Sequence, residues 1–173
     1  MTRTLGATAA VAFALAALAL AAQQKDTFNL TANLKARFEV PSATGVPAGA
    51  VGLFTGKAVE LENDKARVTW RLTFSKLSGR AAAAHIHIGK TGKAGGVMLP
   101  LCGPCRTGQR GSSNISRAQL RKIRSGGTYV NVHTAKNAAG EIRGQVKASQ
   151  VASSSGPAPP PTTPEPPPYP PYP

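Results

Sequence analysis

Residues 65–74 read KARVTWRLTF, and this stretch decides the fold class. Apolar side chains occupy every second position from Ala66 to Phe74, and charged or hydroxylated side chains occupy the positions between them. Successive side chains of a β-strand point to opposite faces, so the alternation predicts a strand with one face in a core and the other in water. Trp70 is the only tryptophan of the chain, and we expect it to anchor that core.

The same alternation recurs before and after this stretch. Residues 28–40 predict a long half-buried strand, or two strands with a bend between them. Residues 50–61 predict another strand, in which Gly52 and Gly56 suggest a bulge. Residues 108–114 are expected to form a polar loop. Further strands are expected at residues 84–88, 97–101, 129–133 and 141–148.

One short helix interrupts this series of strands. Ser116 and Gln119 have the spacing of a capping box, Leu120 and Ile123 form an apolar stripe, and a glycine pair at 126–127 ends the segment. About seven short strands at near-regular spacing with one such helix predict an all-β fold, an antiparallel β-sandwich of immunoglobulin-like type.

Composition divides the chain into three zones. Residues 1–21 combine a positive charge at Arg3 with an Ala/Leu-rich stretch and a small-residue cleavage pattern, which predicts a cleaved signal peptide and a secreted or periplasmic protein. The alternative is an uncleaved anchor, for which the apolar stretch is short. Residues 22–150 can form one domain. Residues 151–173, which are mostly proline from residue 157 onward, predict a disordered tail serving as a spacer, a docking segment or neither.

All three histidines of the chain, His85, His87 and His133, fall in predicted strands. His85 and His87 share one strand face, opposite Ile86 and Ile88, and His133 lies on the face opposite the valines of its own strand. If the aliphatic side chains face the core, all three imidazoles lie on outer faces, where strand pairing could bring them together. Neutral imidazole is the commonest metal ligand among side chains, so the three predict a site for copper or zinc, between which three histidines alone do not select. The alternative is that the histidines only form hydrogen bonds that order the two strands.

The only cysteines are Cys102 and Cys105, in the sequence CGPC. This is the spacing of thioredoxin-type redox motifs, but there the first cysteine begins a helix, and the following Arg-Thr-Gly does not start one. A local structural disulfide is the preferred interpretation, and a redox role is the alternative.

The chain is strongly basic, with a formal net charge of +14, and contains no Asp or Glu between Lys65 and Lys136. Such a surface attracts anionic cell-envelope polymers, although charge alone can also serve to keep an exported protein in solution. The densest basic patch comprises Arg106, Arg110, Arg117, Arg121, Lys122 and Arg124. This patch lacks the interleaved aromatic side chains that stack on bases, so no specific nucleic-acid recognition is expected.

Two motifs carry a resemblance to a known family. Residues 85–89 read HIHIG and residues 129–144 read YVNVHTAKNAAGEIRG. Together they resemble the CHRD (chordin-type) domain, a module common in exported bacterial proteins, and the resemblance covers about residues 27–148.

More distantly, the same motifs resemble the copper-site strands of Cu/Zn superoxide dismutase. That resemblance implies a Greek-key β-sandwich and places His85, His87 and His133 at copper-ligand positions, with Arg143 near an anion-guiding arginine. The chain departs from that pattern, because it has no fourth histidine to bridge to zinc and no zinc ligands in residues 89–96. The resemblance therefore implies at most a mononuclear copper site.

Several enzyme classes find no support in the sequence. The few acids of the expected domain offer no plausible pair for glycosidase or aspartic-protease chemistry. The leading expectation is a non-enzymatic exported binding or structural module that holds copper through its three histidines. The alternatives are a dismutase-like redox enzyme at the same site and an adhesin that binds anionic envelope polymers through the basic patch.

Overall fold

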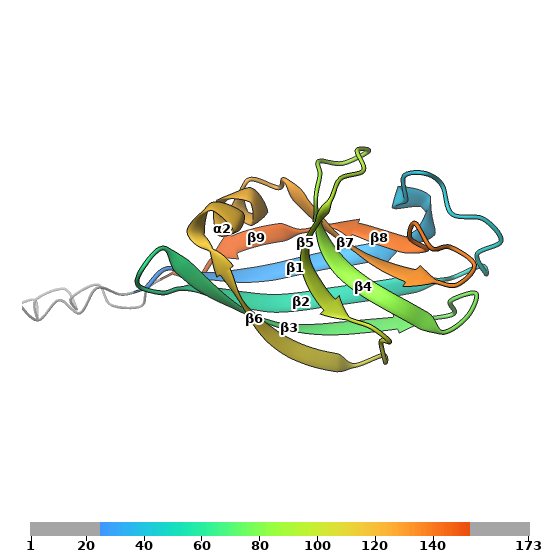
Figure 1. Ribbon diagram of the computed structural model, residues 1–173, viewed down its shortest axis with the longest axis horizontal. Coiled ribbons are helices and arrows are strands. Elements are labelled where there is room, and N and C mark those ends of the chain that lie inside the picture. The colour runs from blue at the N-terminus through green and yellow to red at the C-terminus, as the bar shows by residue number, and fades with distance from the viewer. Residues whose placement is uncertain (1–24, 153–173) are drawn as a thin grey trace, which may run out of the picture.

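The computed structural model describes residues 25–152, an all-β fold with one α-helix (Figure 1). The expected signal peptide and residues 153–173 of the Pro-rich tail lie outside the described residues. Within residues 25–152 no helix has the length and apolar character needed to cross a membrane. The elements are β1 (Thr27–Lys35), η1 (Ala36–Phe38), β2 (Val51–Glu60), β3 (Lys65–Ser75), β4 (Ala81–Ile88), β5 (Val97–Cys102), β6 (Gln109–Ser116), α2 (Arg117–Arg124), β7 (Thr128–Thr134), β8 (Ile142–Gln145) and β9 (Lys147–Gln150).

The strands follow one hydrogen-bonded order, β5-β4-β7-β8-β1-β2-β3-β6, with β9 also paired to β1. Every pairing is antiparallel. Figure 1 shows the β4–β5 end of this order lying in front of β2 and β3. One hydrophobic cluster joins Ile86 and Val130 of the first half to Leu30, Val68 and Leu72 of the second. The sheet therefore curves around a single core, and the all-β expectation is confirmed.

The stretch that decided the fold class forms β3 as expected. Its burial alternates along the strand, and Trp70 is 6% exposed within the core. The helix is also confirmed. The Ser116 hydroxyl accepts from the Gln119 amide at 3.1 Å, and the Gln119 side-chain oxygen accepts from the Ser116 amide at 2.8 Å, which completes the capping box.

The prediction of a polar loop at residues 108–114 is wrong, because these residues lie mostly in β6. The strand pairs with β3, with Arg71 opposite Arg110 and Thr69 opposite Ser112. Gly and Ser have low strand propensity, but pairing with a neighbour overrides it. Gly111 packs against the face of the Trp70 ring, where a β-carbon would collide.

The bulge expected in β2 is also wrong, since β2 pairs with both β1 and β3 without a change of register. Its glycines serve close packing instead. A β-carbon at Gly56 would lie 2.8 Å from the Thr69 carbonyl oxygen, and one at Gly52 would lie 2.9 Å from Ile142 Cδ1. Register shifts occur instead in β4, against β5 on either side of His85 and Ile86 and against β7 between Ala81 and Ala83.

Two predicted strands end or divide where the sequence showed continuous alternation. The first strand stops at Lys35 and continues as η1. The last one divides at Val146 into β8, which pairs with β7, and β9, which pairs with β1. Ile142 and Val146 are buried and Ala148 packs against the core, so both parts of the divided strand contribute to the core.

Candidate metal centre

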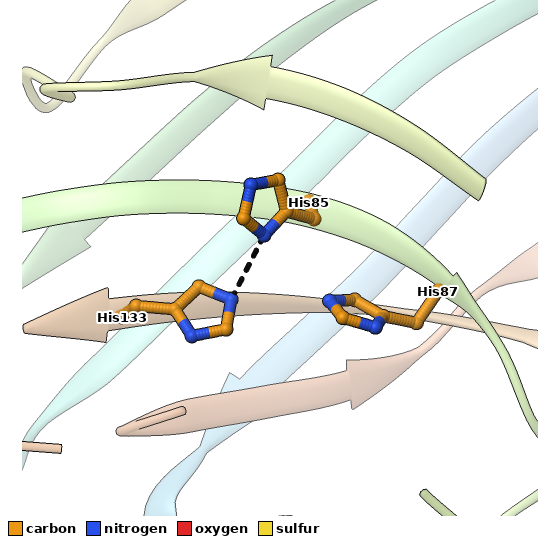
Figure 2. A group of neighbouring side chains, drawn as sticks. All are labelled: His85, His87 and His133. Atoms are coloured by element: carbon orange, nitrogen blue, oxygen red, sulfur yellow. Dashed lines mark hydrogen bonds between the residues drawn. The ribbon is translucent and has the colours of Figure 1, made fainter. Parts of the chain in front are cut away.

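Strands β4 and β7 are neighbours, and their pairing brings the histidines together. The register sets His87 opposite Tyr129 and His85 opposite Asn131. Because Ile86, Val130 and Val132 face the core, the imidazoles project from the outer face of the sheet, where Figure 2 shows the rings converging. One nitrogen from each of the three rings can be chosen so that all lie within 4.8 Å of one another. The three histidines are therefore close enough to hold one metal ion.

Backbone carbonyls set the tautomers of two rings. His87 Nδ1 lies 2.9 Å from the Gly95 carbonyl oxygen, and His133 Nδ1 lies 2.9 Å from that of Ala138. Carbonyl oxygens only accept, so each Nδ1 carries the hydrogen and each Nε2 keeps a lone pair. The Nε2 of His87 is buried and has no hydrogen-bond partner among residues 25–152. This is the arrangement in which metal-binding histidines are oriented by groups behind them.

The third ring closes the cluster through a direct contact. His85 Nδ1 lies 3.0 Å from His133 Nε2 (Figure 2). Because His133 Nε2 accepts, His85 Nδ1 donates in the absence of an ion. An ion between the rings would replace this hydrogen bond and move the His85 proton to Nε2.

The surroundings favour uncharged imidazoles. Burial lowers the pKa of His85, and the adjacent His133 and His87 rings lower it further. Burial also lowers the pKa of His133, against the opposing effect of the Ala138 carbonyl. A metal binds the neutral ring, so these shifts favour the ligand form at neutral pH.

The loop of residues 89–96 closes over one side of the cluster. It returns tightly enough that the Ile88 amide donates to the Gly96 carbonyl at 3.0 Å. A β-carbon at Gly95 would collide with the Ile88 carbonyl oxygen, so only glycine permits this approach. The Gly95 carbonyl thereby reaches His87, and the Gly95 amide donates to the Tyr129 hydroxyl at 3.2 Å.

Arg143 also holds the loop of residues 89–96 in place through hydrogen bonds. Its Nη2 donates to the carbonyl oxygens of Lys90 at 3.1 Å and Lys93 at 2.8 Å. Its guanidinium carbon lies 3.4 Å from the centre of the Tyr129 ring, which also stacks on His87 with centroids 5.0 Å apart. Arg143 is only 2% exposed. The residue expected to bind anions is thus buried, packed on the Tyr129 ring and hydrogen-bonded to the loop of residues 89–96.

A comparison with models of known protein families supports the resemblance carried by the two motifs. The family model for the CHRD domain matches residues 30–146. This chain belongs to the CHRD domain family. Searches of curated proteins and of solved structures give no match. The match spans β4, β7 and β8, and so includes every residue of the histidine cluster.

Among residues 25–152 of this CHRD domain, two members of the predicted basic patch form ion pairs and the other four do not. Arg117 lies 3.7 Å from Glu60 and 3.5 Å from Asp64, and Arg124 lies 3.5 Å from Glu60. The remaining members, Arg106, Arg110, Arg121 and Lys122, are exposed and form no ion pair within the described residues. The sequence did not reveal the pairing because those acids precede the acid-free stretch along the chain and reach the helix only through the fold.

The two cysteines lie where the domain's fifth strand ends. The sulfur atoms of Cys102 and Cys105 are 2.10 Å apart, at the distance of a disulfide bond. The Cys105 amide donates to the Ala81 carbonyl at 3.0 Å, which holds the small loop against β4. No helix begins at Cys102, so the dipole that activates a thioredoxin-type cysteine is lacking here.

Sequence reasoning missed the buried polar residues that support the site. Glu141 is fully buried and accepts hydrogen bonds from Ser78, Thr134 and Asn137. The Asn137 side chain in turn accepts from the Thr44 amide at 2.9 Å and donates to the Thr44 carbonyl at 3.2 Å. The only signal in the sequence was the set of polar residues within the second family motif. These polar residues do not follow the alternation of a strand.

Glu39 is a second buried acid that sequence analysis did not single out. It is 5% exposed, and burial raises its pKa to about 7 despite the opposing charge of Arg143. Gly140, at φ +137°, leaves the space that Glu39 occupies, since a β-carbon there would lie 2.6 Å from Glu39 Oε1. Glu39 is therefore a candidate for a pH-dependent contribution to stability.

Substitution of Glu39 by Gln should make the domain more stable at alkaline pH. The folded pKa lies above the ordinary value of 4.5, so Glu39 destabilises the fold progressively as pH rises from 4.5 to about 7. The full effect is about 3 kcal/mol. We expect Glu39→Gln to match the wild type near pH 4 and to exceed it by this order at pH 8, measured by urea unfolding. All other titratable groups are the same in both proteins, so their contribution cancels in the difference. An unchanged difference between pH 4 and pH 8 would contradict the assignment.

Proposed function

We propose that this chain is an exported CHRD module that binds one copper ion through His85, His87 and His133. The observation that carries the proposal is the hydrogen bonding behind the rings. Two Nδ1 atoms are committed to backbone carbonyls, so two Nε2 lone pairs remain for an ion, and that of His87 is buried and unpartnered. An unpartnered buried polar atom is costly unless a ligand satisfies it.

The donor chemistry favours copper among the divalent metals. Three neutral imidazoles form a nitrogen donor set, and affinity for such sites rises along the first transition row to a maximum at Cu²⁺. His85 and His133 are only partly buried, which leaves one side of the cluster open for water or another ligand. Export is supported by the residues 1–21 pattern and by the cysteine pair, because disulfides persist in oxidising compartments.

Copper titration of the untagged protein tests the proposal. The chain holds only three histidines, so any imidazole nitrogen seen in the Cu²⁺ paramagnetic resonance spectrum must come from this cluster. We expect one Cu²⁺ per chain, bound with imidazole nitrogen couplings, and a rise in melting temperature on binding. Binding without imidazole couplings, such as binding by a free amino terminus, would refute the site.

The choice of metal is tested separately. Equilibration with equal Cu²⁺ and Zn²⁺, followed by elemental analysis of the protein, should return copper in excess. Zinc in excess would retain the three-histidine site and overturn its assignment to copper.

A further inference from the structure

The outer face of the β9-β1-β2-β3-β6 sheet is a separate feature of the molecule, and it shares no residue with the histidine cluster. Burial alternates along β1, β2 and β3, so every second side chain of these strands faces outward. Most of these outward side chains are exposed. They are mainly Thr, Asn, Ser, Lys and Arg. We call this surface the outer basic face and define it by Asn29, Thr31, Asn33, Lys35, Thr55, Lys57, Arg67, Thr69, Arg71, Thr73, Arg110, Ser112, Asn114, Lys147 and Ser149.

The strand registers align these side chains in rows across the sheet. One row runs Lys147, Thr31, Thr55, Arg71 and Arg110. The next row towards the β2–β3 turn runs Ser149, Asn29, Lys57, Thr69 and Ser112. Strands lie about 4.8 Å apart, so a row of five strands spans about 19 Å. Both of these rows offer hydroxyl or amide groups and at least one cation.

The face carries a charge of one sign. No acidic side chain is among its residues, and none of its cations forms an ion pair within the described residues. The nearby acids Asp26, Glu60, Glu62 and Asp64 lie at the end of the face formed by the start of β1 and the β2–β3 turn, where Lys65 is six strand positions from Arg71. Those positions correspond to about 20 Å, beyond the screening length of physiological salt. No acidic side chain therefore lies on the central row itself, whose charged members are Lys147, Arg71 and Arg110.

Arg71 and Arg110 face each other directly across β3 and β6. Like charges directly opposite on neighbouring strands destabilise a sheet, and no acid offsets this pair. A bound anion would remove the repulsion. At its other end the row reaches a cavity of about 410 Å³, whose lining includes Lys147, Thr31 and the exposed Arg37 and Phe38, together with the buried Glu39.

We propose that the outer basic face binds a linear anionic polysaccharide laid across the strands. The cations of the face, which form no ion pair with an acid in the part of the chain that the structure describes, can pair with the anionic groups of the polysaccharide. The hydroxyl and amide side chains between them can form hydrogen bonds with its neutral hydroxyl groups. The face itself carries no aromatic side chain on which a nucleic-acid base could stack. This surface differs from the helix-centred patch that the sequence suggested, which shares only Arg110 with it.

The test compares two charge-matched double variants of the full chain. Arg71→Gln/Arg110→Gln removes two cations from the face, and Arg121→Gln/Lys122→Gln removes two exposed cations from α2. The probes are dextran sulfate and polygalacturonate, with neutral dextran as the reference. We expect the face variant to lose at least about tenfold in affinity and to show a shallower salt dependence, and the helix variant to change by less than about twofold.

The outcomes separate the possibilities. Equal losses in the two variants would show that only net charge matters and would overturn the proposal. The same holds if neither anionic polymer binds, or if a single-stranded oligonucleotide binds more tightly than both. Thermal unfolding guards against a folding defect, because removing the opposed arginines should leave the melting temperature unchanged or raise it. If the face variant loses both affinity and stability, the single variant Lys57→Gln is tested as well. Lys57 has no opposing cation on either neighbouring strand, so its removal tests the face without the arginine pair.

Discussion

Replacing Glu141 with alanine is expected to lower the free energy of unfolding by about 3–5 kcal/mol. The carboxylate is fully buried and accepts from the Ser78 amide, the Ser78 and Thr134 hydroxyls and the Asn137 side chain. Burial alone would raise the pKa of Glu141, but these hydrogen bonds together lower it, so the charged form is the stable one. Alanine would remove the acceptor shared by these donors, of which the Thr134 and Asn137 side chains are buried.

Urea denaturation at neutral pH measures this effect. Glu62→Ala is the matched control, because the Glu62 side chain is 83% exposed and its ion pair with Lys25 lies at the surface. We expect the control to change stability by less than about 0.5 kcal/mol. Equal small losses from both substitutions would show that the Glu141 network contributes little. Glu141→Gln should lose an intermediate amount of stability, because the glutamine amide has one acceptor oxygen where the carboxylate has two.

Substitution of a single histidine should reduce copper affinity by at least about 100-fold. Loss of a group that merely orients a ligand costs about 10- to 100-fold, and loss of a ligand should cost at least as much. The expectation applies to His87→Ala and His133→Ala, whose Nε2 atoms are held ready by backbone carbonyls. Competition titration with a chelator of known affinity gives the dissociation constants.

Thr91→Ala serves as the control for this experiment, since Thr91 lies in the same covering loop and is exposed. It should bind copper as the wild type does. Melting temperatures without metal show whether each variant is folded, so a loss of binding can be assigned to the missing ligand. Copper affinity that survives in both histidine variants would remove the cluster as the binding site.

Local periodicity accounts for most of the correct predictions. The alternation at residues 65–74 placed Trp70 in the core, and the Ser116–Gln119 spacing placed the helix start. The errors occurred where a neighbouring strand overrode local preference. Polar residues became β6 because β3 supplies their hydrogen bonds, and Gly56 allows a close approach to Thr69 instead of forming a bulge.

The candidate site was predictable in its residue types but not in its geometry. Strand parity put His85, His87 and His133 on faces opposite their aliphatic neighbours. The structure buries Ile86, Val130 and Val132 as expected but leaves Ile88, at the end of β4, 40% exposed. Nothing local predicted the carbonyls of Gly95 and Ala138 behind the rings, because those contacts depend on how two loops fold back. The same reason hid the burial of Arg143 and Glu39.

By itself, the sequence determined the all-β class, the strand faces, the capped helix and the identity of the three imidazoles. These follow from two-residue and helical periodicities, which act over a few residues and can be read from any short window. Tertiary structure alone decided which strands pair and in which register. Pairing joins segments far apart along the chain, and its energy comes from the whole core rather than from either strand. That pairing set His85 against His133, Arg71 against Arg110, and Arg117 beside Glu60.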